Sequence, residues 1–497
     1  MHTPEALLFV GPQYTDSRRK SANILRRHFL AALDPLGIAI VSAYLRKTGV
    51  ETRLITMEDQ SKADYASQIE KADAVFVSAR QFDRDLAQEV LQTADRLKKI
   101  SIAGGYGPSF DPEGFSTATA RVLGEAEPVL PQLNEDWLSG RSLSPTYDAT
   151  TLPPFDLDQY VWPDRTIFPR SANPFKQNTQ EWQRGCKNRC IFCSPSRMQG
   201  GIRFRPPADI LAELDNLHLK RGDYVFSVDL NSMVIPKEQL REIFLGLSER
   251  GLRWSTEGTV APLIKDFEIN GEKGLLGLMS GVDPKRGGCY SFHYGADDLS
   301  SPKVCGSYDK NLNDLEKAVG LFRQFTIPLN LSVIVGLDNH TYPESFFEIA
   351  GALTELAPGY TFLHIATPLK GTPWGDRLDR DRKIIDRTST HYNHRQAVHE
   401  PKQMTSKQLQ QGYYWLLRTI YSPPMIARSF QRNFSAELFI KNPFLALMVT
   451  GIPWQTEAWT SVTELTARGY LDRKVQKEMD AEYQRWKGER ANSGNRN

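Results

Sequence analysis

Short apolar runs and amphipathic segments alternate along the first third of the chain. The apolar runs lie at residues 6–10, 52–55, 74–78 and 101–103, and helical patterns lie at 35–45 and 83–98. Strands that alternate with helices form βαβ units, so the pattern predicts a parallel, doubly wound α/β (Rossmann-like) sheet over residues 1–140. Ligands of such sheets lie outside the carboxyl ends of the strands. We therefore expect the loops after Ser78 and Ala103 to carry ligand contacts.

Two glycines follow the last of these strands. Gly104 and Gly105 would allow a bulky ligand to approach the backbone closely, although a tight turn alone would also use them. The segment contains no G-x-G-x-x-G pattern, so a dinucleotide site is not supported.

A second alternating region begins after residues 141–180, a segment rich in Pro, Asp and aromatic residues that we interpret as a linker. Strands are predicted at 181–184, 224–228, 252–256, 289–293, 328–335 and 360–365, and an amphipathic helix at 208–219. Active sites of α/β barrels form at the carboxyl ends of their strands. The candidate site residues at these ends are Asp229, Asn231, Glu257, Asp297 and Gly336. Each could instead be a capped or solvated loop residue.

The last part of the chain, residues 376–487, is predicted to be a mainly helical extension. Its clearest helical patterns lie at 407–421 and 463–486, and we expect these helices to cap the open end of the preceding strands. Residues 488–497 are polar and are predicted to be disordered.

Composition limits the class of protein only broadly. The 497 residues are 40% apolar and 24% charged, as in an ordinary soluble protein, and the net charge of +2 gives no argument for nucleic acid binding. No apolar run is long enough to span a membrane, and the N-terminus lacks the pattern of a signal peptide. We therefore expect the protein in the reducing cytoplasm.

Three of the five cysteines lie within one short stretch. Cys186, Cys190 and Cys193 have C-x3-C-x2-C spacing, so their thiolates can converge within a single loop and suit three corners of a [4Fe–4S] cluster. The fourth iron would remain open for a substrate or cofactor. A structural zinc site is the alternative, but zinc usually takes paired C-x2-C units and four ligands. Five cysteines in a chain of this length do not suggest a disulfide framework.

This loop resembles that of the radical S-adenosylmethionine (radical SAM) family, C-x3-C-x-aromatic-C, with Phe192 at the aromatic position. The resemblance implies that SAM chelates the open iron and that one electron from the cluster splits it into methionine and a 5′-deoxyadenosyl radical. It also implies a partial (β/α)6 barrel over residues 181–375, with Asp229, Asn231, Glu257, Asp297 and Gly336 near SAM. An electron donor such as flavodoxin or ferredoxin is implied as a partner.

The N-terminal region resembles the cobalamin-binding domain that precedes the barrel in many radical SAM enzymes. The matching stretches are residues 35–37, 104–108 and 124–127. The resemblance implies cobalamin contacts from Leu36, Gly37, Ser78, Gly104, Gly105, Tyr106 and Glu125.

Two departures from that pattern concern histidine. Gly107 replaces the His of the usual G-G-x-H-P stretch, and the D-x-H-x-x-G loop that supplies a lower cobalt ligand is absent. His2 and His28 are the region's only histidines, so we expect cobalamin to bind base-off without a His lower ligand.

Other cysteines and histidines are weaker candidates. Cys289 starts an apolar strand and is more simply a buried inert thiol than a methyl acceptor, and the same holds for Cys305. His391, His394 and His399 lack the spacing of a helical metal pair, so substrate contact is the more useful hypothesis.

Together these resemblances imply a cobalamin-dependent radical SAM enzyme that methylates an unactivated carbon of a small molecule, with methylcobalamin as the methyl source. A cyclase or rearranging enzyme with the same cofactors is one alternative. An Fe–S or zinc protein whose N-terminal domain only binds partners is another. The sequence does not choose between a lipid, a tetrapyrrole, an antibiotic precursor and a peptide as the substrate.

Overall fold

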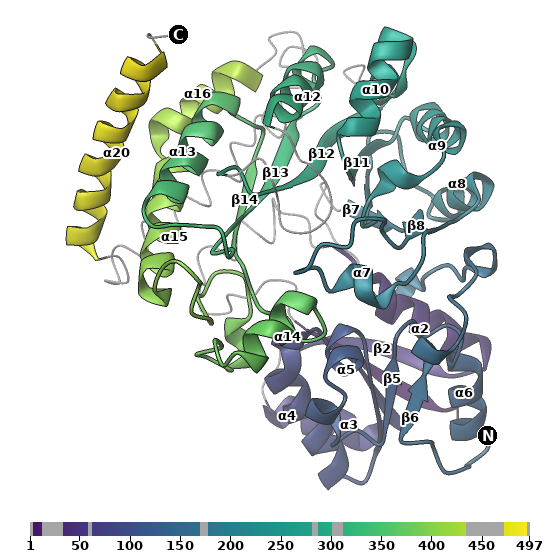
Figure 1. The fold of residues 1–497 in the computed structure, drawn as a ribbon. Helices are drawn as coiled ribbons and strands as arrows, with labels where there is room; N and C mark the ends of the chain where they lie inside the picture. The colour runs from purple at the N-terminus through teal and green to yellow at the C-terminus, as the bar shows by residue number, and fades with distance from the viewer. Residues whose placement is uncertain are drawn as a thin grey trace.

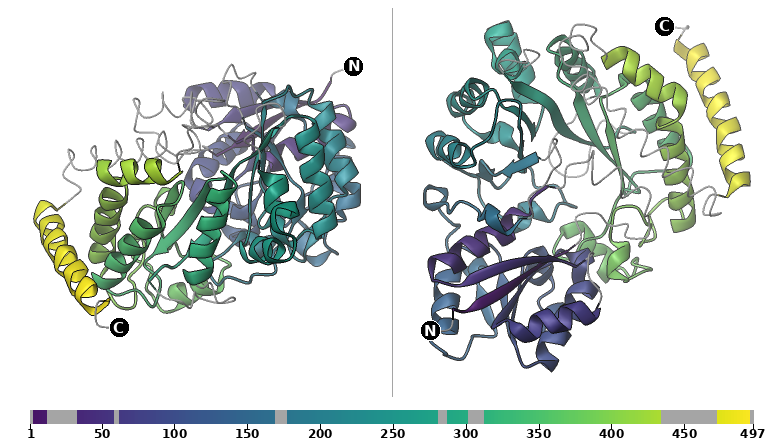
Figure 2. Two further views of the ribbon diagram at one scale, coloured as in Figure 1. Left: turned by 90° about the horizontal axis from the view of Figure 1, so that it is seen from above. Right: turned by 180° about the vertical axis from the view of Figure 1, so that it is seen from behind.

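The computed structural model describes residues 3–11, 33–57, 62–168, 177–280, 287–300, 312–433 and 472–494. Two six-stranded sheets dominate this part of the chain, one from each half, and each is flanked by helices (Figures 1 and 2). Every pairing between neighbouring strands within these two sheets is parallel.

The first sheet has the strand order β2-β1-β3-β4-β5-β6. Its strands are β1 (Glu5–Val10), β2 (Glu51–Thr56), β3 (Ala74–Ser78), β4 (Ile100–Gly104), β5 (Ala120–Leu123) and β6 (Thr146–Asp148). Its helices are α2 (Leu36–Lys47), α3 (Lys62–Lys71), α4 (Arg84–Arg96), α5 (Tyr106–Phe110) and α6 (Leu130–Leu138). Alternate residues of β1 enter different cores: Leu7 and Phe9 pack on one face and Ala6 and Leu8 on the other. A sheet buried on both faces explains the continuous apolar runs, and the predicted doubly wound sheet is confirmed.

The second sheet has the order β14-β13-β12-β11-β10-β7. Its strands are β7 (Gln177–Gln180), β10 (Tyr224–Ser227), β11 (Arg253–Glu257), β12 (Gly288–Asp297), β13 (Leu329–Val335) and β14 (Thr361–Ile365). Its helices are α8 (Pro207–Asn216), α9 (Lys237–Glu249), α10 (Ala261–Asn270), α11 (Leu275–Met279), α12 (Leu312–Gln324) and α13 (Glu344–Leu356). The edge strands β7 and β14 are not paired with each other, so the six strands form an open, partial barrel.

One face of the second sheet is buried under its helices, and the other is partly open. Along β13, Leu329, Leu331 and Val333 are at most 3% exposed and pack in the main core, whereas Asn330 and Ser332 between them are only half-buried. Buried and half-buried residues therefore alternate along β13, as in a barrel strand whose inner face is not filled by apolar side chains.

The segment predicted as a linker, 141–180, contains a strand at each end. β6 is the last strand of the first sheet, and β7 is an edge strand of the second. Both are poor in apolar residues, with the sequences TYD and QNTQ, so hydrophobic periodicity does not reveal them. Short 3₁₀ segments lie between them: η3 (Ala149–Thr151), η4 (Leu157–Gln159) and η5 (Arg165–Ile167). The linker prediction therefore needs correction at both ends.

The described part of the C-terminal region is helical. It comprises α14 (Pro373–Arg380), α15 (Ser406–Ile420), α16 (Pro423–Asn433) and α20 (Arg473–Gly494). α15 packs against α13, and α20 lies outermost beside α15 (Figure 1). Trp415 of α15 packs against Phe347 of α13 and against Tyr483 of α20, with ring centroids 5.2 Å apart in both pairs. That the extension caps the open end of the strands stays a prediction, since residues 434–471 lie outside the described part of the chain.

The predicted disorder of residues 488–497 is also wrong for 488–494, since α20 continues to Gly494. Arg490 stacks over the Trp486 ring at 4.8 Å, which favours continuation of the helix. Within the described parts of the chain, we find no helix that is both long and apolar enough to cross a membrane.

Candidate functional site

The three-cysteine loop lies between a small β-clasp and a short helix. β8 (Gln183–Arg184) pairs antiparallel with β9 (Arg203–Phe204), and α7 (Pro195–Met198) follows the last cysteine. Gly185 has φ +85°, and a Cβ on it would lie 2.4 Å from the carbonyl oxygen of Gly201. Only glycine fits this turn, so the clasp fixes where the loop begins.

All three cysteines of the loop lie outside any disulfide and are half-buried. Burial raises the pKa of Cys186, and the Cys193 thiolate raises it further, whereas the backbone N–H of Asn188 and the Asn231 side chain lower it. Among the described residues, no three or more His, Cys, Asp and Glu side chains are grouped closely enough to hold one metal ion. Half-buried thiols with hydrogen-bond donors beside them fit a [4Fe–4S] cluster, whose thiolate ligands occupy separate corners.

Phe192 anchors the loop across the mouth of the open barrel. Ile191 and Phe192 pack against an apolar group made by Leu337, Ala366, Trp374 and Leu378, which follow β13 and β14. The backbone N–H of Trp374 also donates to the carbonyl oxygen of Ile191 at 3.1 Å. The loop therefore runs from the β7 side of the sheet to the β14 side, and the aromatic position serves this packing.

Asp229, predicted beside SAM, holds the chain that leads into the cysteine loop. Its Oδ1 accepts hydrogen bonds from the backbone N–H groups of Trp182 (2.8 Å) and Gln183 (3.1 Å). Its Oδ2 accepts from the hydroxyls of Ser227 and Ser232. Burial raises the pKa of Asp229 to about 6 in spite of these bonds. With both oxygens engaged, Asp229 is a positioning residue.

Glu257 lies near Asp229, and Asn231 follows Asp229 by two residues; the side chains of both are less fully engaged. Asn231 Oδ1 accepts from the backbone N–H of Thr259 at 3.1 Å, and its amide N–H group, beside Cys186, lowers the pKa of that thiol. Burial, and then the nearby charge of Asp229, raise the pKa of Glu257 to about 8, so its carboxyl group is mainly protonated at neutral pH. Both can therefore offer a hydrogen bond to a ligand.

Gln183 is a candidate site residue that the sequence did not indicate. Its side chain is 1% exposed, and neither atom of its amide has a hydrogen-bond partner within the described structure. An unpaired buried amide is costly unless a ligand completes it. Gln183 precedes Cys186 by three residues, but nothing in its local sequence distinguishes it from the other glutamines of the strand.

The other two predicted SAM contacts lie in turns at the strand ends. Asp297 ends β12 with φ +58° and is buried. Gly336 follows β13 with φ +87°, its N–H donates to His340 Nδ1 at 3.1 Å, and a Cβ on it would lie 2.7 Å from a methyl group of Leu409. Gly336 is therefore explained by the turn and by close helix packing.

The carboxyl end of the first sheet faces the cysteine loop. α5, which follows β4, contacts α7, which follows Cys193. Tyr106 at the start of α5 has its pKa raised by burial, by Glu181 and by Cys193, so its hydroxyl lies close to the loop. Gly105 has φ +95°, and a Cβ on it would lie 2.9 Å from the carbonyl oxygen of Ala79 beyond β3. The predicted residues Ser78, Gly104, Gly105 and Tyr106 therefore share one edge.

The two remaining stretches that resemble the cobalamin-binding domain, residues 35–37 and 124–127, differ in how accessible they are to a ligand. Gly37 is exposed near the start of α2, and a Cβ on it would meet nothing within 4 Å, whereas Leu36 beside it is buried. Glu125 is already bound: it accepts from both terminal nitrogens of Arg203, at 2.8 and 2.7 Å. Its carboxylate joins the two halves of the molecule, which leaves it little capacity for a ligand.

Comparisons with known proteins support both halves of this site. The B12 binding domain family matches residues 22–134, and the radical SAM superfamily matches residues 181–349. The chain combines a B12-binding domain with a radical SAM domain. The resemblance predicted from the cysteine loop and from the N-terminal glycines is thereby confirmed. No curated protein matches the chain.

Solved structures of two such enzymes share the fold of this B12-binding radical SAM protein. The radical SAM methyltransferase TsrM from Kitasatospora setae, with cobalamin and a [4Fe–4S] cluster bound, aligns with a TM-score of 0.57 at 16% identity over 93% of this chain and 99% of that one. The cobalamin-dependent radical SAM enzyme OxsB aligns with a TM-score of 0.59 at 13% identity over 98% and 83% of the two chains.

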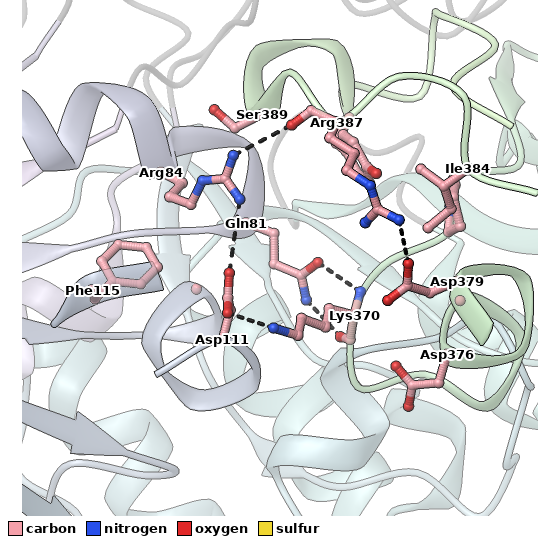
Figure 3. Close-up of a pocket in the computed structure, with 14 residues that line it drawn as sticks. Gln81, Arg84, Asp111, Phe115, Lys370, Asp376, Asp379, Ile384, Arg387 and Ser389 are labelled. Carbon is pink, nitrogen blue, oxygen red and sulfur yellow. Dashed lines mark hydrogen bonds and ion pairs between the residues drawn. The ribbon is translucent and has the colours of Figure 1, made fainter. Parts of the chain in front are cut away.

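In this B12-binding radical SAM protein, the segment after β14 is attached to the N-terminal domain around a cavity of about 140 Å³ (Figure 3). The side-chain amide of Gln81 accepts from the N–H of Lys370 at 2.9 Å and donates to its carbonyl oxygen at 2.7 Å. The Lys370 ammonium lies 2.6 Å from Asp111, and Arg387 lies 2.5 Å from Asp379. The Lys370–Asp111 pair and the hydrogen bonds of Gln81 cross from one domain to the other and hold them together, whereas the Arg387–Asp379 pair lies within the segment after β14.

Among the described residues, Cys289 and the three C-terminal histidines lie at separate places. Cys289 is buried and its thiol pKa is raised by burial, as expected of an inert core thiol, while Cys305 lies outside the described residues. His391 lies 2.6 Å from Asp386, His394 packs its ring against His364, and His399 packs against Trp374. These three histidines contact different neighbours.

Proposed function

We propose that the protein is a cobalamin-dependent radical SAM methyltransferase that acts on an unactivated carbon of a small molecule. One observation carries the proposal: the edge of the first sheet that bears Ser78, Gly104, Gly105 and Tyr106 faces the three-cysteine loop through the contact of α5 with α7. A cobalamin on that edge and a cluster in that loop would share one chamber. Exclusion of water from such a chamber protects a reactive intermediate.

The chain's own residues would divide the work as follows. Cys186, Cys190 and Cys193 would hold the cluster, and Gln183 and Asn231 would offer buried amide groups to SAM. Glu257, protonated at neutral pH, would donate a hydrogen bond without placing a negative charge beside the carboxylate of SAM. Cobalamin would supply a transferable methyl group, and the cluster with SAM would supply the radical chemistry.

Anaerobic reconstitution tests this proposal directly. The native protein, supplied with iron, sulfide, cobalamin, SAM and a reductant, is expected to form 5′-deoxyadenosine and to retain one cobalamin, as measured by mass spectrometry and visible absorbance. The Cys190→Ala variant is expected to lose the cleavage of SAM. Cys289→Ala is the matched control, because Cys289 is buried outside the chamber and is expected to leave cleavage intact.

The fate of the methyl group separates methylation from rearrangement. With SAM labelled with deuterium on its methyl group, a methyltransferase transfers the label to its product, whereas a cyclase or rearranging enzyme leaves the product unlabelled. SAM cleavage without retained cobalamin would overturn the methyl-transfer proposal. An intact cluster that never cleaves SAM, with any substrate tried, would instead favour an Fe–S protein that binds partners.

A further inference from the structure

Three aromatic rings meet on the inner face of the open barrel, although they come from strands that are not neighbours. The centroid of the His293 ring in β12 lies 5.7 Å from that of Phe226 in β10 and 5.5 Å from that of Phe362 in β14. β11 separates β12 from β10, and β13 separates it from β14. Neighbouring strands lie about 4.8 Å apart, so these strands are about 10 Å from each other. The three side chains therefore converge, as they do on the concave side of a curled sheet.

The three rings remain accessible from the inside of the barrel. Phe226, His293 and Phe362 each occupy a half-buried position between fully buried ones. We call these three residues the aromatic floor. The strand register pairs His293 with Glu257 of β11, so the floor lies beside the carboxyl group that we assign to SAM.

Polar side chains extend from the same face around the aromatic floor. Asn330 and Ser332 occupy half-buried positions of β13, and His364 occupies one of β14. The register pairs Asn330 with His293 and Ser332 with Phe362. Within the part of the chain that the structure describes, the side chains of Asn330, Ser332, His293 and His364 make no hydrogen bond. Polar groups at such depth are normally hydrogen-bonded, so these four are available to solvent or to a ligand.

The inner face carries no permanent charge at these positions. The half-buried positions of β10, β12, β13 and β14 hold no Asp, Glu, Lys or Arg. Burial lowers the pKa of His293 to about 4 and that of His364 to about 3, so both imidazoles are neutral at neutral pH. On β11, Glu257 is mainly protonated, and Arg253 lies at the opposite end of the strand, where it donates to the Tyr224 hydroxyl at 2.8 Å. A charged group on the floor would find no opposite charge at these positions.

We propose that the aromatic floor is the substrate subsite and that it takes an uncharged aromatic or heteroaromatic ring. The inference names the substrate class of the enzyme and so rests on the proposed function. Converging rings offer both faces and edges for stacking. The side chains of Asn330, Ser332 and His364 can donate to and accept from the polar edge of such a ring. Substrates whose reacting part carries a phosphate or a carboxylate are excluded, because a buried charge without a partner is costly.

The test measures the binding of simple bicyclic compounds to the holoenzyme. The reconstituted protein, with cobalamin and saturating SAM but without a reductant, is dialysed anaerobically against each probe, and the bound probe is quantified by chromatography. The probes are 2-naphthol (neutral and aromatic), 2-naphthoate (anionic and aromatic) and 2-decalol (neutral and not aromatic). We expect 2-naphthol to bind at least about 10-fold more tightly than 2-naphthoate and about 3- to 10-fold more tightly than 2-decalol. Saturating SAM keeps the site of its adenine occupied throughout.

Substitutions show where the probe binds. Phe362→Leu removes one ring of the floor but keeps an apolar side chain, and the affinity for 2-naphthol is expected to fall about 3- to 10-fold. His293→Leu removes the ring that contacts the other two and is expected to have an effect of similar size. The matched control is Phe267→Leu, because Phe267 is a half-buried residue of the outer helix α10 whose ring contacts Phe325 at 5.8 Å. The control should bind 2-naphthol as the native protein does, and urea unfolding verifies that all variants are folded.

Three results would overturn the subsite. One is equal binding of 2-naphthol and 2-naphthoate by the native protein, and another is no measurable binding of 2-naphthol. The third is native affinity for 2-naphthol in both Phe362→Leu and His293→Leu. If these two variants instead lose affinity for SAM, the floor belongs to the adenine of SAM and not to the substrate.

Failure of the proposed function gives a different result. A native protein that never forms 5′-deoxyadenosine with a reductant present would contradict the proposed function, while probe binding, measured without reductant, still reports on the floor. Normal formation of 5′-deoxyadenosine, with no preference for 2-naphthol over 2-naphthoate, would contradict the aromatic subsite alone.

Discussion

The carboxylate of Glu127 lies 2.6 Å from the guanidinium of Arg184, and each residue is only 5% exposed. Glu127 follows β5 of the first sheet, whereas Arg184 ends the strand that leads into the three-cysteine loop. One buried ion pair therefore connects the B12-binding domain to the cluster loop. Because Glu181 also contacts Arg184, at 2.9 Å, the charge of the guanidinium is compensated from both halves of the molecule.

Replacement of Glu127 is expected to destabilise the fold. In Glu127→Gln the buried guanidinium loses one of its charged acceptors, and charge-assisted hydrogen bonds are worth about 1.5–3 kcal/mol. We expect the free energy of unfolding in urea to fall by about 2 kcal/mol. Glu135→Gln is the control, because the Glu135–Arg141 pair is exposed at both ends and is expected to change stability by less than about 0.5 kcal/mol. Equal effects of the two changes would contradict the buried connection.

Gln183 is expected to affect the cofactor and not the fold. In Gln183→Leu no internal hydrogen bond is lost, because neither amide atom has a described partner, so the apoprotein should keep its stability. Affinity for SAM in the reconstituted protein is expected to fall about 10-fold, the value of one hydrogen bond at a buried site. Equilibrium binding and urea unfolding measure the two effects.

Gln180→Leu is the matched comparison for Gln183. The Gln180 amide donates to the carbonyl oxygen of Ile210 at 2.8 Å and accepts from Trp182 Nε1 at 2.9 Å. Its loss is expected to destabilise the apoprotein by about 1–3 kcal/mol. If Gln183→Leu instead lowers stability and leaves SAM affinity unchanged, the assignment of Gln183 to the cofactor chamber is wrong.

The sequence predicts this molecule best where the chemistry is local. The three cysteines and Phe192 lie within eight residues and indicate one family. The strands β1, β3 and β13 are rich in apolar residues, so hydrophobic periodicity predicts them. The same periodicity does not predict β7, whose sequence is QNTQ, because β7 is held by backbone pairing with β10 and by polar contacts, such as the one between Gln180 and Ile210.

The rest of the site depends on contacts between distant segments. Glu125 belongs to a stretch that resembles a cobalamin motif, yet its partner is Arg203, 78 residues away. The role of Asp229 as an anchor for Trp182 and Gln183 similarly appears only once the strand ends are brought together. A pattern of residue types carries no information about which of these long-range partners will occupy a side chain.

Glu257 is expected to make stability depend on pH. Its pKa is about 8 in the folded protein and near 4.5 when unfolded, so folding favours its protonated form. The corresponding stabilisation is complete below about pH 4.5 and is lost as the pH rises through 8. Between pH 5 and 9 the free energy of unfolding of the native protein should therefore fall by on the order of 4 kcal/mol more than that of Glu257→Gln. Asp229, whose pKa is about 6, contributes equally to the pH dependence of stability in the native protein and in Glu257→Gln.

The measurement is the free energy of unfolding of the apoprotein at several pH values. Glu242→Gln serves as the control, since Glu242 is an exposed residue of α9 and should leave the native pH dependence unchanged. Parallel curves for the native protein and Glu257→Gln would mean that Glu257 titrates normally, and its role as a neutral donor to SAM would then be lost.

Two glycines at the edge of the first sheet are expected to respond in opposite ways. Gly105→Ala places a Cβ 2.9 Å from the carbonyl oxygen of Ala79 at φ +95°, so it should destabilise the apoprotein by about 1–3 kcal/mol. A Cβ on Gly37 would meet nothing within 4 Å and Gly37 is exposed, so the Gly37→Leu apoprotein should be at least as stable as the native one. If cobalamin packs against the start of α2, the new side chain should reduce cobalamin retention about 10-fold. Gel filtration with visible absorbance measures retention, and native retention by Gly37→Leu would exclude this helix end from the cobalamin site.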